Sequence, residues 1–175
     1  MSNQWKRGYV QVYTGDGKGK TTAALGLAVR AAGADLRIFI AQFVKGMDYS
    51  ELRALERHPE IEVRRYGREC FIEREPGPED IEAARAGLAE AREELVGGAW
   101  DIVILDEANI ATHFGLFTVD ELLEVIAERP TSVELVITGR RADPRVIEAA
   151  DLVTEMREVK HYYAQGVSCR RGIES

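Results

Sequence analysis

The sequence predicts an α/β protein with a mostly parallel sheet of about six strands and with helices on both faces of that sheet. Short apolar runs that suit buried strands alternate with longer helical patterns along the chain. A glycine-rich segment also stands between the first expected strand and the first expected helix. Because this alternation brings parallel strands together through right-handed crossovers, both observations favour the same fold class.

The expected strands are short runs of β-branched and aliphatic residues, bounded by glycine, proline or charged residues. The run at 102–105 contains only apolar residues, which predicts a strand that is buried on both faces. The expected strands cover residues 9–13, 37–43, 61–66, 100–107, 133–138 and 152–156.

The expected helices are marked by start and stop signals. Gly33 ends the first helix, and Pro78 with the two acidic residues after it begins a long one. The expected helices run from 21 to about 34, from 51 to 57, from 78 to the glycines at 97–98, from 119 to Pro130 and from 143 to 150. No repeat or linker divides the chain, so we expect one domain over residues 1–175, with a short N-terminal arm at 1–7 and a C-terminal tail at 157–175.

Composition narrows the class of protein. The chain of 175 residues is 45% hydrophobic and 30% charged, as in globular domains. No apolar run approaches the roughly 18 residues of a membrane span, and the N-terminus has no signal-peptide segment. We therefore expect a cytoplasmic protein without a membrane partner. The formal charge of −7 argues against nucleic acid as a partner, and the two cysteines and three histidines show no metal-binding spacing.

The glycine-rich segment at residues 14–22 reads TGDGKGKTT and resembles a P-loop in its place between strand and helix. Its alternating glycines allow successive backbone N–H groups to point at phosphate oxygens, and the following helix adds the positive end of its dipole. The strict P-loop pattern fails at one position, because Thr14 stands where the first glycine belongs. The segment predicts a P-loop NTPase-like fold that binds a nucleoside triphosphate through Thr14, Gly15, Asp16, Gly17, Lys18, Gly19, Lys20, Thr21 and Thr22.

Two side chains of this loop have expected chemical roles. Lys20 supplies a positive charge to the outer phosphates, and the hydroxyl of Thr21 is placed to hold Mg²⁺. Lys18 is a further catalytic candidate. It does not belong to the general P-loop pattern, so it could instead be a solvated side chain.

The expected strand at 100–107 delivers Asp106 and Glu107 at its C-terminal end, where ligands bind in open α/β sheets. A carboxylate at this edge, opposite a P-loop, is the usual second contact to Mg²⁺. Arg140 follows the strand at 133–138 and is the third catalytic candidate beside Lys20 and Lys18, although it could simply pair with Asp143. These motifs alone leave three functions open: group transfer from ATP, an ATPase or kinase reaction at the γ-phosphate, and a non-catalytic nucleotide-dependent regulatory module.

An ordered set of segments is similar to the P-loop class of ATP:corrinoid adenosyltransferases. The segments are RG-hydrophobic-TG-x-GKGKTTAA at 7–24, QF-hydrophobic-KG at 42–46, hydrophobic-LDE at 104–107, ITGR at 137–140, AD-hydrophobic-VTEM at 150–156, KH at 160–161 and GV…GIE at 166–174. The chain departs from the common pattern at Asp16, where asparagine is usual, and at Ser175, where an aromatic residue often follows. Phe71 also lacks the tryptophan that typical members carry beside it.

The resemblance implies a reaction in which Co(I) of a reduced corrinoid, cobalamin or a precursor, attacks the 5′ carbon of ATP and releases triphosphate. It also implies that ATP is held with its γ-phosphate in the P-loop, that Glu107 rather than Asp106 contacts Mg²⁺, and that the protein is a homodimer served by an electron-donating flavoprotein reductase. Apolar bulk beneath the cobalt would ease its reduction by excluding a lower ligand. Phe71 and Ile72, in the connection at 67–78, are the candidates for this corrinoid contact.

Overall fold

The computed structural model describes residues 5–44, 50–67 and 76–174 of the chain. Its centre is a six-stranded sheet in the order β3-β2-β4-β5-β1-β6, in which every neighbouring pair is parallel. The strands are β1 Val10–Thr14, β2 Ile38–Phe43, β3 Ile61–Tyr66, β4 Ile102–Asp106, β5 Glu134–Thr138 and β6 Leu152–Glu155. The predicted α/β fold with a parallel sheet is therefore confirmed.

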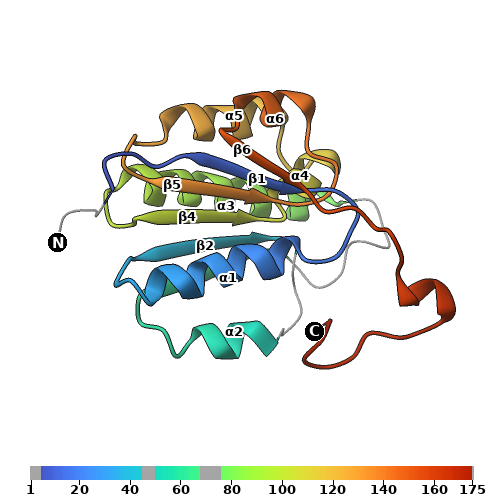
Figure 1. The fold of residues 1–175 in the computed structure, drawn as a ribbon. Helices are drawn as coiled ribbons and strands as arrows, with labels where there is room; N and C mark the ends of the chain where they lie inside the picture. The colour runs from blue at the N-terminus through green and yellow to red at the C-terminus, as the bar shows by residue number, and fades with distance from the viewer. Residues whose placement is uncertain (1–4, 45–49, 68–75, 175) are drawn as a thin grey trace.

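Helices cover both faces of the sheet (Figure 1). They are α1 Lys20–Ala32, α2 Ser50–Leu55, α3 Pro78–Val96, α4 Ala108–His113, α5 Val119–Glu128 and α6 Pro144–Ala149, and a 3₁₀ helix at Tyr162–Gln165 lies in the C-terminal tail. Helices α1 and α2 contribute to one apolar core, while α3 and α5 contribute to a larger core on the opposite face. The central strand β4 supplies residues to both cores, which explains its unbroken apolar run.

Two helices were not predicted from the sequence. Helix α4 has only six residues and begins after Glu107, whose side chain makes no capping hydrogen bond. The 3₁₀ helix is shorter still, with four residues, and its cap is the ring of His161, which accepts a hydrogen bond from the N–H of Tyr163 at 3.1 Å. Neither helix has the length or the apolar period that makes a helix visible in a sequence.

The register of the sheet brings the ends of four strands to one edge. Gln42 of β2 lies opposite Asp106 of β4, and Tyr13 of β1 lies opposite Thr138 of β5. Leu105 pairs with Ile137, so the next residues along, Asp106 and Thr138, are also neighbours. The P-loop, Glu107 and Arg140 all follow directly from strands that end at this edge. This edge therefore positions the candidate site.

Helix α3 approaches the sheet closely at Gly87. A methyl group added there would lie 2.2 Å from Cγ of Tyr66 in β3, which is too close for the ring to accommodate without moving. We expect Gly87→Ala to lower the free energy of unfolding by about 1–3 kcal/mol through overpacking, measured by urea denaturation. Gly26→Ala in α1 is the matched control, because nothing lies within 4 Å of its added methyl group. It should be neutral or stabilising, so equal losses in both variants would contradict the packing account.

Candidate active site

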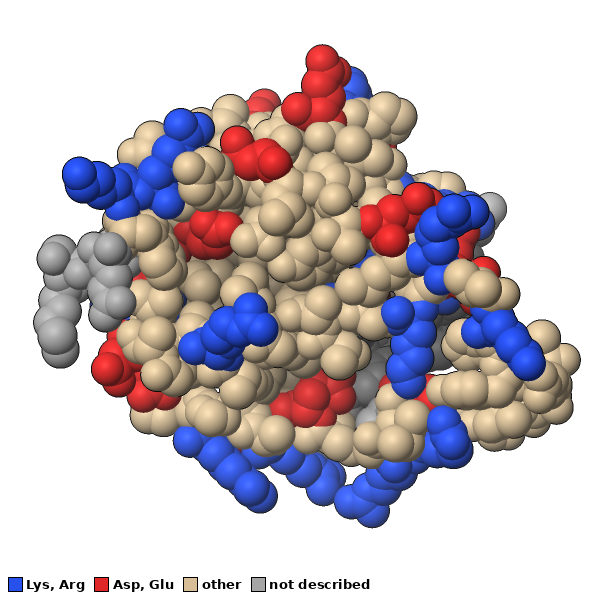
Figure 2. Space-filling view, in the orientation of Figure 1, with Lys and Arg blue, Asp and Glu red and all other residues tan. Residues whose placement is uncertain are grey.

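A pocket of about 890 Å³ lies at the C-terminal edge of the sheet, a volume that suits a nucleotide-sized ligand. Residues 16–22 of the P-loop form one side, together with Glu107 and Arg140. Residues of α1 and α2, together with His161 and residues 172–174 of the tail, form the rest of the wall. Figure 2 shows a hollow between the body of the protein and the tail, with Lys and Arg side chains around it. The structure thus brings the predicted loop, carboxylate and arginine to one cavity.

Glycine is required in the P-loop for two local reasons: the backbone conformation and the close approach of another segment. Gly15 and Gly19 have φ angles of 94° and 118°, which side chains with a Cβ rarely adopt. The segment after β6 also approaches the loop, and a Cβ on Gly15 would lie 2.4 Å from the carbonyl oxygen of Met156. That carbonyl accepts a hydrogen bond of 2.7 Å from the N–H of Gly17. The segment after β6, at Met156, therefore packs against the loop and fixes its backbone by a hydrogen bond.

The departure from the P-loop pattern at Thr14 has a structural explanation. Thr14 is the last residue of β1 and is buried, so its position does not require the conformational freedom of glycine. Its hydroxyl accepts a hydrogen bond from the N–H of Ala142 at 3.3 Å. Thr14 and Gly15 lie behind the pocket wall, whereas the seven residues from Asp16 to Thr22 line it.

The side chain of Lys20 bonds to the backbone of its own loop. Its Nζ donates hydrogen bonds of 2.7 Å to the carbonyl oxygens of Gly15 and Gly17, and the residue is only 6% exposed. Burial lowers the pKa of Lys20, and the nearby carboxylate of Glu107 opposes this effect. The ammonium group is therefore held within the glycine-rich loop, and Lys20 lines the pocket.

Asp106 is the centre of a buried hydrogen-bond network. Its Oδ1 accepts from the hydroxyls of Thr21 at 2.9 Å and Thr138 at 2.6 Å. Its Oδ2 accepts from the side-chain amide of Gln42 at 3.1 Å. Asp106 is 1% exposed and is absent from the pocket lining. It therefore orients the Thr21 hydroxyl from behind the site.

Glu107 lies on the other side of the same turn. Its φ angle is +63°, a left-handed conformation that is uncommon for a non-glycine residue, and it lines the pocket. The two neighbouring carboxylates, which the sequence could not separate, thus have different positions. The oxygen donors of Thr21 and Glu107 suit Mg²⁺, which commonly takes one or two protein ligands and completes its shell with phosphates and water. Among the described residues, no group of three or more His, Cys, Asp or Glu side chains has the arrangement of a metal site made by protein ligands alone.

Arg140 follows β5 and lines the pocket. The expected alternative partner, Asp143, instead accepts a hydrogen bond of 2.9 Å from the N–H of Arg145 at the start of α6. The Arg145 guanidinium also lies 3.4 Å from the same carboxylate. Arg140 therefore lines the cavity, while Asp143 is engaged by Arg145.

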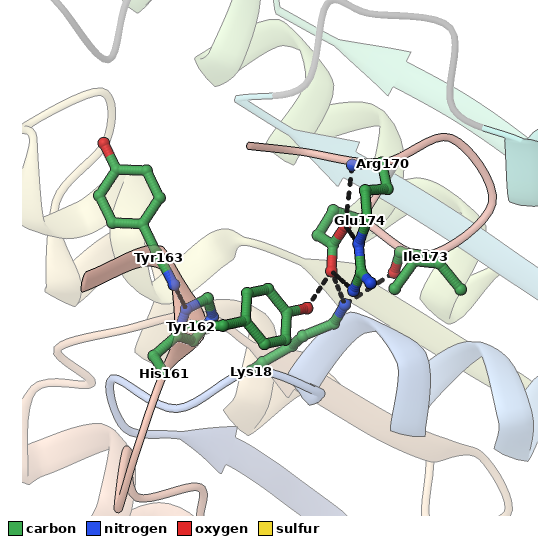
Figure 3. Close-up of polar contacts among 7 residues, drawn as sticks. All are labelled: Lys18, His161, Tyr162, Tyr163, Arg170, Ile173 and Glu174. Atoms are coloured by element: carbon green, nitrogen blue, oxygen red, sulfur yellow. Dashed lines mark hydrogen bonds and ion pairs between the residues drawn. The ribbon is translucent and has the colours of Figure 1, made fainter. Parts of the chain in front are cut away.

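Lys18 has a partner that sequence reasoning missed. Its Nζ donates to the carbonyl oxygen of Ile173 at 2.7 Å and pairs with the carboxylate of Glu174 at 3.1 Å (Figure 3). Glu174 also accepts from the Arg170 guanidinium and the Tyr162 hydroxyl. The Arg170 and Tyr162 bonds hold the pKa of Glu174 far below its usual range. The only sequence signal for this tail contact, which we call the Glu174 clasp, was the GIE segment of the family resemblance.

The contribution of the Glu174 clasp to the order of the tail can be measured by amide hydrogen exchange. Glu174→Gln removes the charge that gathers Lys18, Arg170 and Tyr162, so we expect faster amide exchange across residues 162–174 and an unchanged melting temperature. Because the folded pKa is depressed, the clasp contributes fully above the ordinary Glu pKa of about 4.3 and is lost only as the pH falls below it. The protection that the clasp gives to the amides at 170–174 should therefore stay constant between about pH 8 and pH 5.

The matched control for the clasp is Glu158→Gln, which removes the same charge from an exposed position in the tail. If both variants exchange equally fast, charge in general rather than the clasp holds the tail.

The predicted corrinoid contacts Phe71 and Ile72 lie outside the described residues. None of the helices that the structure describes combines the length and the apolar character needed to cross a membrane.

Comparisons with known proteins show the family of the chain. A family model described as ATP:corrinoid adenosyltransferase BtuR/CobO/CobP matches residues 6–175. A corrinoid adenosyltransferase of Pseudomonas aeruginosa is 37% identical over 97% of this chain and 84% of its own length. A corrinoid adenosyltransferase of Escherichia coli is 35% identical over 98% of this chain and 87% of its own. Corrinoid adenosyltransferase CobA of Salmonella typhimurium is 34% identical over the same shares. The chain belongs to the ATP:corrinoid adenosyltransferase family.

Proposed function

We propose that this chain transfers the 5′-deoxyadenosyl group of ATP to the Co(I) of a reduced corrinoid. Co(I) supplies the electron pair that forms the cobalt–carbon bond. The bond between the 5′ carbon and its oxygen breaks, and the electrons leave with inorganic triphosphate. The observation that supports this proposal best is the convergence of Lys20, Thr21, Glu107 and Arg140 on one pocket in a chain of this family.

The proposed reaction needs stabilisation of a leaving group more than activation of a nucleophile. Negative charge accumulates on the triphosphate as the bond breaks, so fixed positive groups that meet it lower the barrier. Lys20, the loop amides and Arg140 can supply such groups on one side of the pocket. Resemblance to the family implies that the γ-phosphate of ATP sits in the P-loop, and we adopt this orientation in the proposal because it would direct the ribose toward the corrinoid. No general base is required, because Co(I) is already strongly nucleophilic.

We further propose that Thr21 and Glu107 hold Mg²⁺ at the phosphates, with Asp106 orienting the Thr21 hydroxyl. The ion would neutralise charge on the leaving triphosphate. The ammonium group of Lys18 is now bound to the tail, so the phosphates would compete with Glu174 for this charge when ATP binds.

Phe71 and Ile72 are our candidates for the apolar contact beneath the cobalt. Family membership supports further proposals: that the chain acts in the cytoplasm as one domain, forms a homodimer and receives electrons for cobalt from a flavoprotein reductase. Light scattering of the purified protein would test the dimer.

A spectroscopic experiment tests the proposed function. The protein is incubated with ATP, Mg²⁺ and chemically reduced cobalamin, and the corrinoid absorption spectrum is followed with time. We expect conversion to the spectrum of an alkylated, light-sensitive Co(III) corrinoid, and no conversion when ATP is omitted. An unchanged spectrum with folded protein and Co(I) present would reject adenosyl transfer.

A further inference from the structure

We propose that Thr138 is a positioning residue that sets the places of both the Thr21 hydroxyl and the Glu107 carboxylate. This inference rests on the proposed function, because those two groups are the ones proposed to hold Mg²⁺. Thr138 is absent from the pocket lining and so would act through its neighbours.

The hydroxyl of Thr138 joins the two neighbouring acidic residues. Thr138 ends β5 and is fully buried. Its Oγ1 donates its single proton to Oδ1 of Asp106 at 2.6 Å and accepts a hydrogen bond from the N–H of Glu107 at 2.9 Å. The hydroxyl thus acts as a donor to Asp106 and as an acceptor from Glu107, the two residues on either side of the turn.

The first of these bonds reaches Thr21 through one shared atom. Oδ1 of Asp106 accepts from Thr138 at 2.6 Å and from Thr21 at 2.9 Å. Gln42 holds only the other oxygen, at 3.1 Å. Without the Thr138 hydroxyl, the carboxylate can rotate about its remaining contacts, and the Thr21 hydroxyl loses a fixed acceptor.

The second bond holds the unusual backbone of Glu107. A non-glycine residue at φ +63° persists only where its surroundings hold it. The hydrogen bond from the Glu107 N–H to Thr138 is one such contact. The close packing of Gly139, which follows Thr138, against α4 is another. A Cβ on the next residue, Gly139, would lie 2.9 Å from the backbone nitrogen of Ile110 in α4. The end of β5 is thus pressed against the start of α4, and Thr138 fixes the turn that aims Glu107 into the pocket.

Thr138→Val tests the role, because valine replaces the hydroxyl by a methyl group of similar size. The affinity for a non-reactive ATP analogue is measured by titration calorimetry with and without Mg²⁺. In the wild type we expect Mg²⁺ to tighten binding. In Thr138→Val that gain should fall about tenfold or more, as for other groups that orient metal ligands, while metal-free affinity stays within about twofold.

Two further variants make the test specific. Thr138→Ser keeps the hydroxyl and should retain the Mg²⁺ gain. Thr138→Ala also lacks the hydroxyl but adds no methyl group against Asp106, and it replaces Thr138→Val if that variant does not fold. The inference is overturned if the hydroxyl-free variant keeps the full Mg²⁺ gain, or if Thr138→Ser loses as much.

The same experiment separates this inference from the proposed function. A wild-type protein without any Mg²⁺ gain would overturn the inference together with the proposed metal site. A wild-type protein that shows the gain, with loss in Thr138→Val but no adenosyl transfer, would support the inference and overturn the transfer reaction alone.

Discussion

Lys20→Ala is expected to reduce the rate of adenosyl transfer at least about a hundredfold, which corresponds to about 2.7 kcal/mol of transition-state stabilisation. The reason is the position of the charge. The Lys20 ammonium is buried in the loop, bonded to Gly15 and Gly17, and lines the pocket. Few water molecules can replace it when negative charge develops on the triphosphate. The rate is measured from the corrinoid spectrum under saturating ATP and Mg²⁺.

The control for this variant is Lys6→Ala, which removes the same charge from an exposed residue outside the pocket lining. It should leave the rate unchanged. Lys18→Ala should cost less than Lys20→Ala, because Lys18 is more exposed and already neutralised by Glu174. If folded Lys20→Ala turns over at a near-normal rate, the assignment of the loop as the triphosphate site is wrong.

The second large effect concerns the metal. Thr21→Ala and Glu107→Gln should each raise the Mg²⁺ concentration needed for half-maximal rate by about tenfold to a hundredfold. Thr21 loses a hydroxyl that Asp106 orients at 2.9 Å, and Glu107 loses the charge that faces the pocket. Because both groups would serve one ion, the loss in the double variant should be well short of the sum of the single losses.

The measurement is a Mg²⁺ titration of the transfer rate for the wild type, both single variants and the double variant. Asp106→Asn is informative beside them, because Asp106 orients the Thr21 hydroxyl from behind the site. Combining it with Thr21→Ala should therefore add little further loss. Additive losses from Thr21→Ala and Glu107→Gln, with an unchanged Mg²⁺ requirement, would show that the two residues work separately.

Much of the fold could be predicted because its signals are local. The unbroken apolar run of β4 was sufficient to predict a strand buried on both faces, which the structure confirms. Helix α5 showed an apolar period and a closing proline, and the structure places it at Val119–Glu128 with a capping box at Thr118. The candidate site followed from the same logic, since the ends of parallel strands meet at one edge.

The remaining features depend on contacts between residues that are distant in the sequence. Helix α4 follows from the left-handed turn at Glu107, which is held in part by a side chain of β5. The Glu174 clasp joins residues more than 150 positions apart, so no local period could indicate it. Thr138 reads as an ordinary strand residue until the register places it beside Asp106.

The nature of the phosphate product tests the central claim most directly. After a single incubation with Co(I) corrinoid, ATP and Mg²⁺, the phosphates are separated by ion-exchange chromatography and compared with the amount of alkylated corrinoid. Adenosyl transfer predicts one intact triphosphate for each adenosylated corrinoid, with no accompanying ADP. Recovery of ADP and phosphate would indicate an ATPase or kinase, and intact ATP would indicate a module that only binds nucleotide; either result would contradict this account.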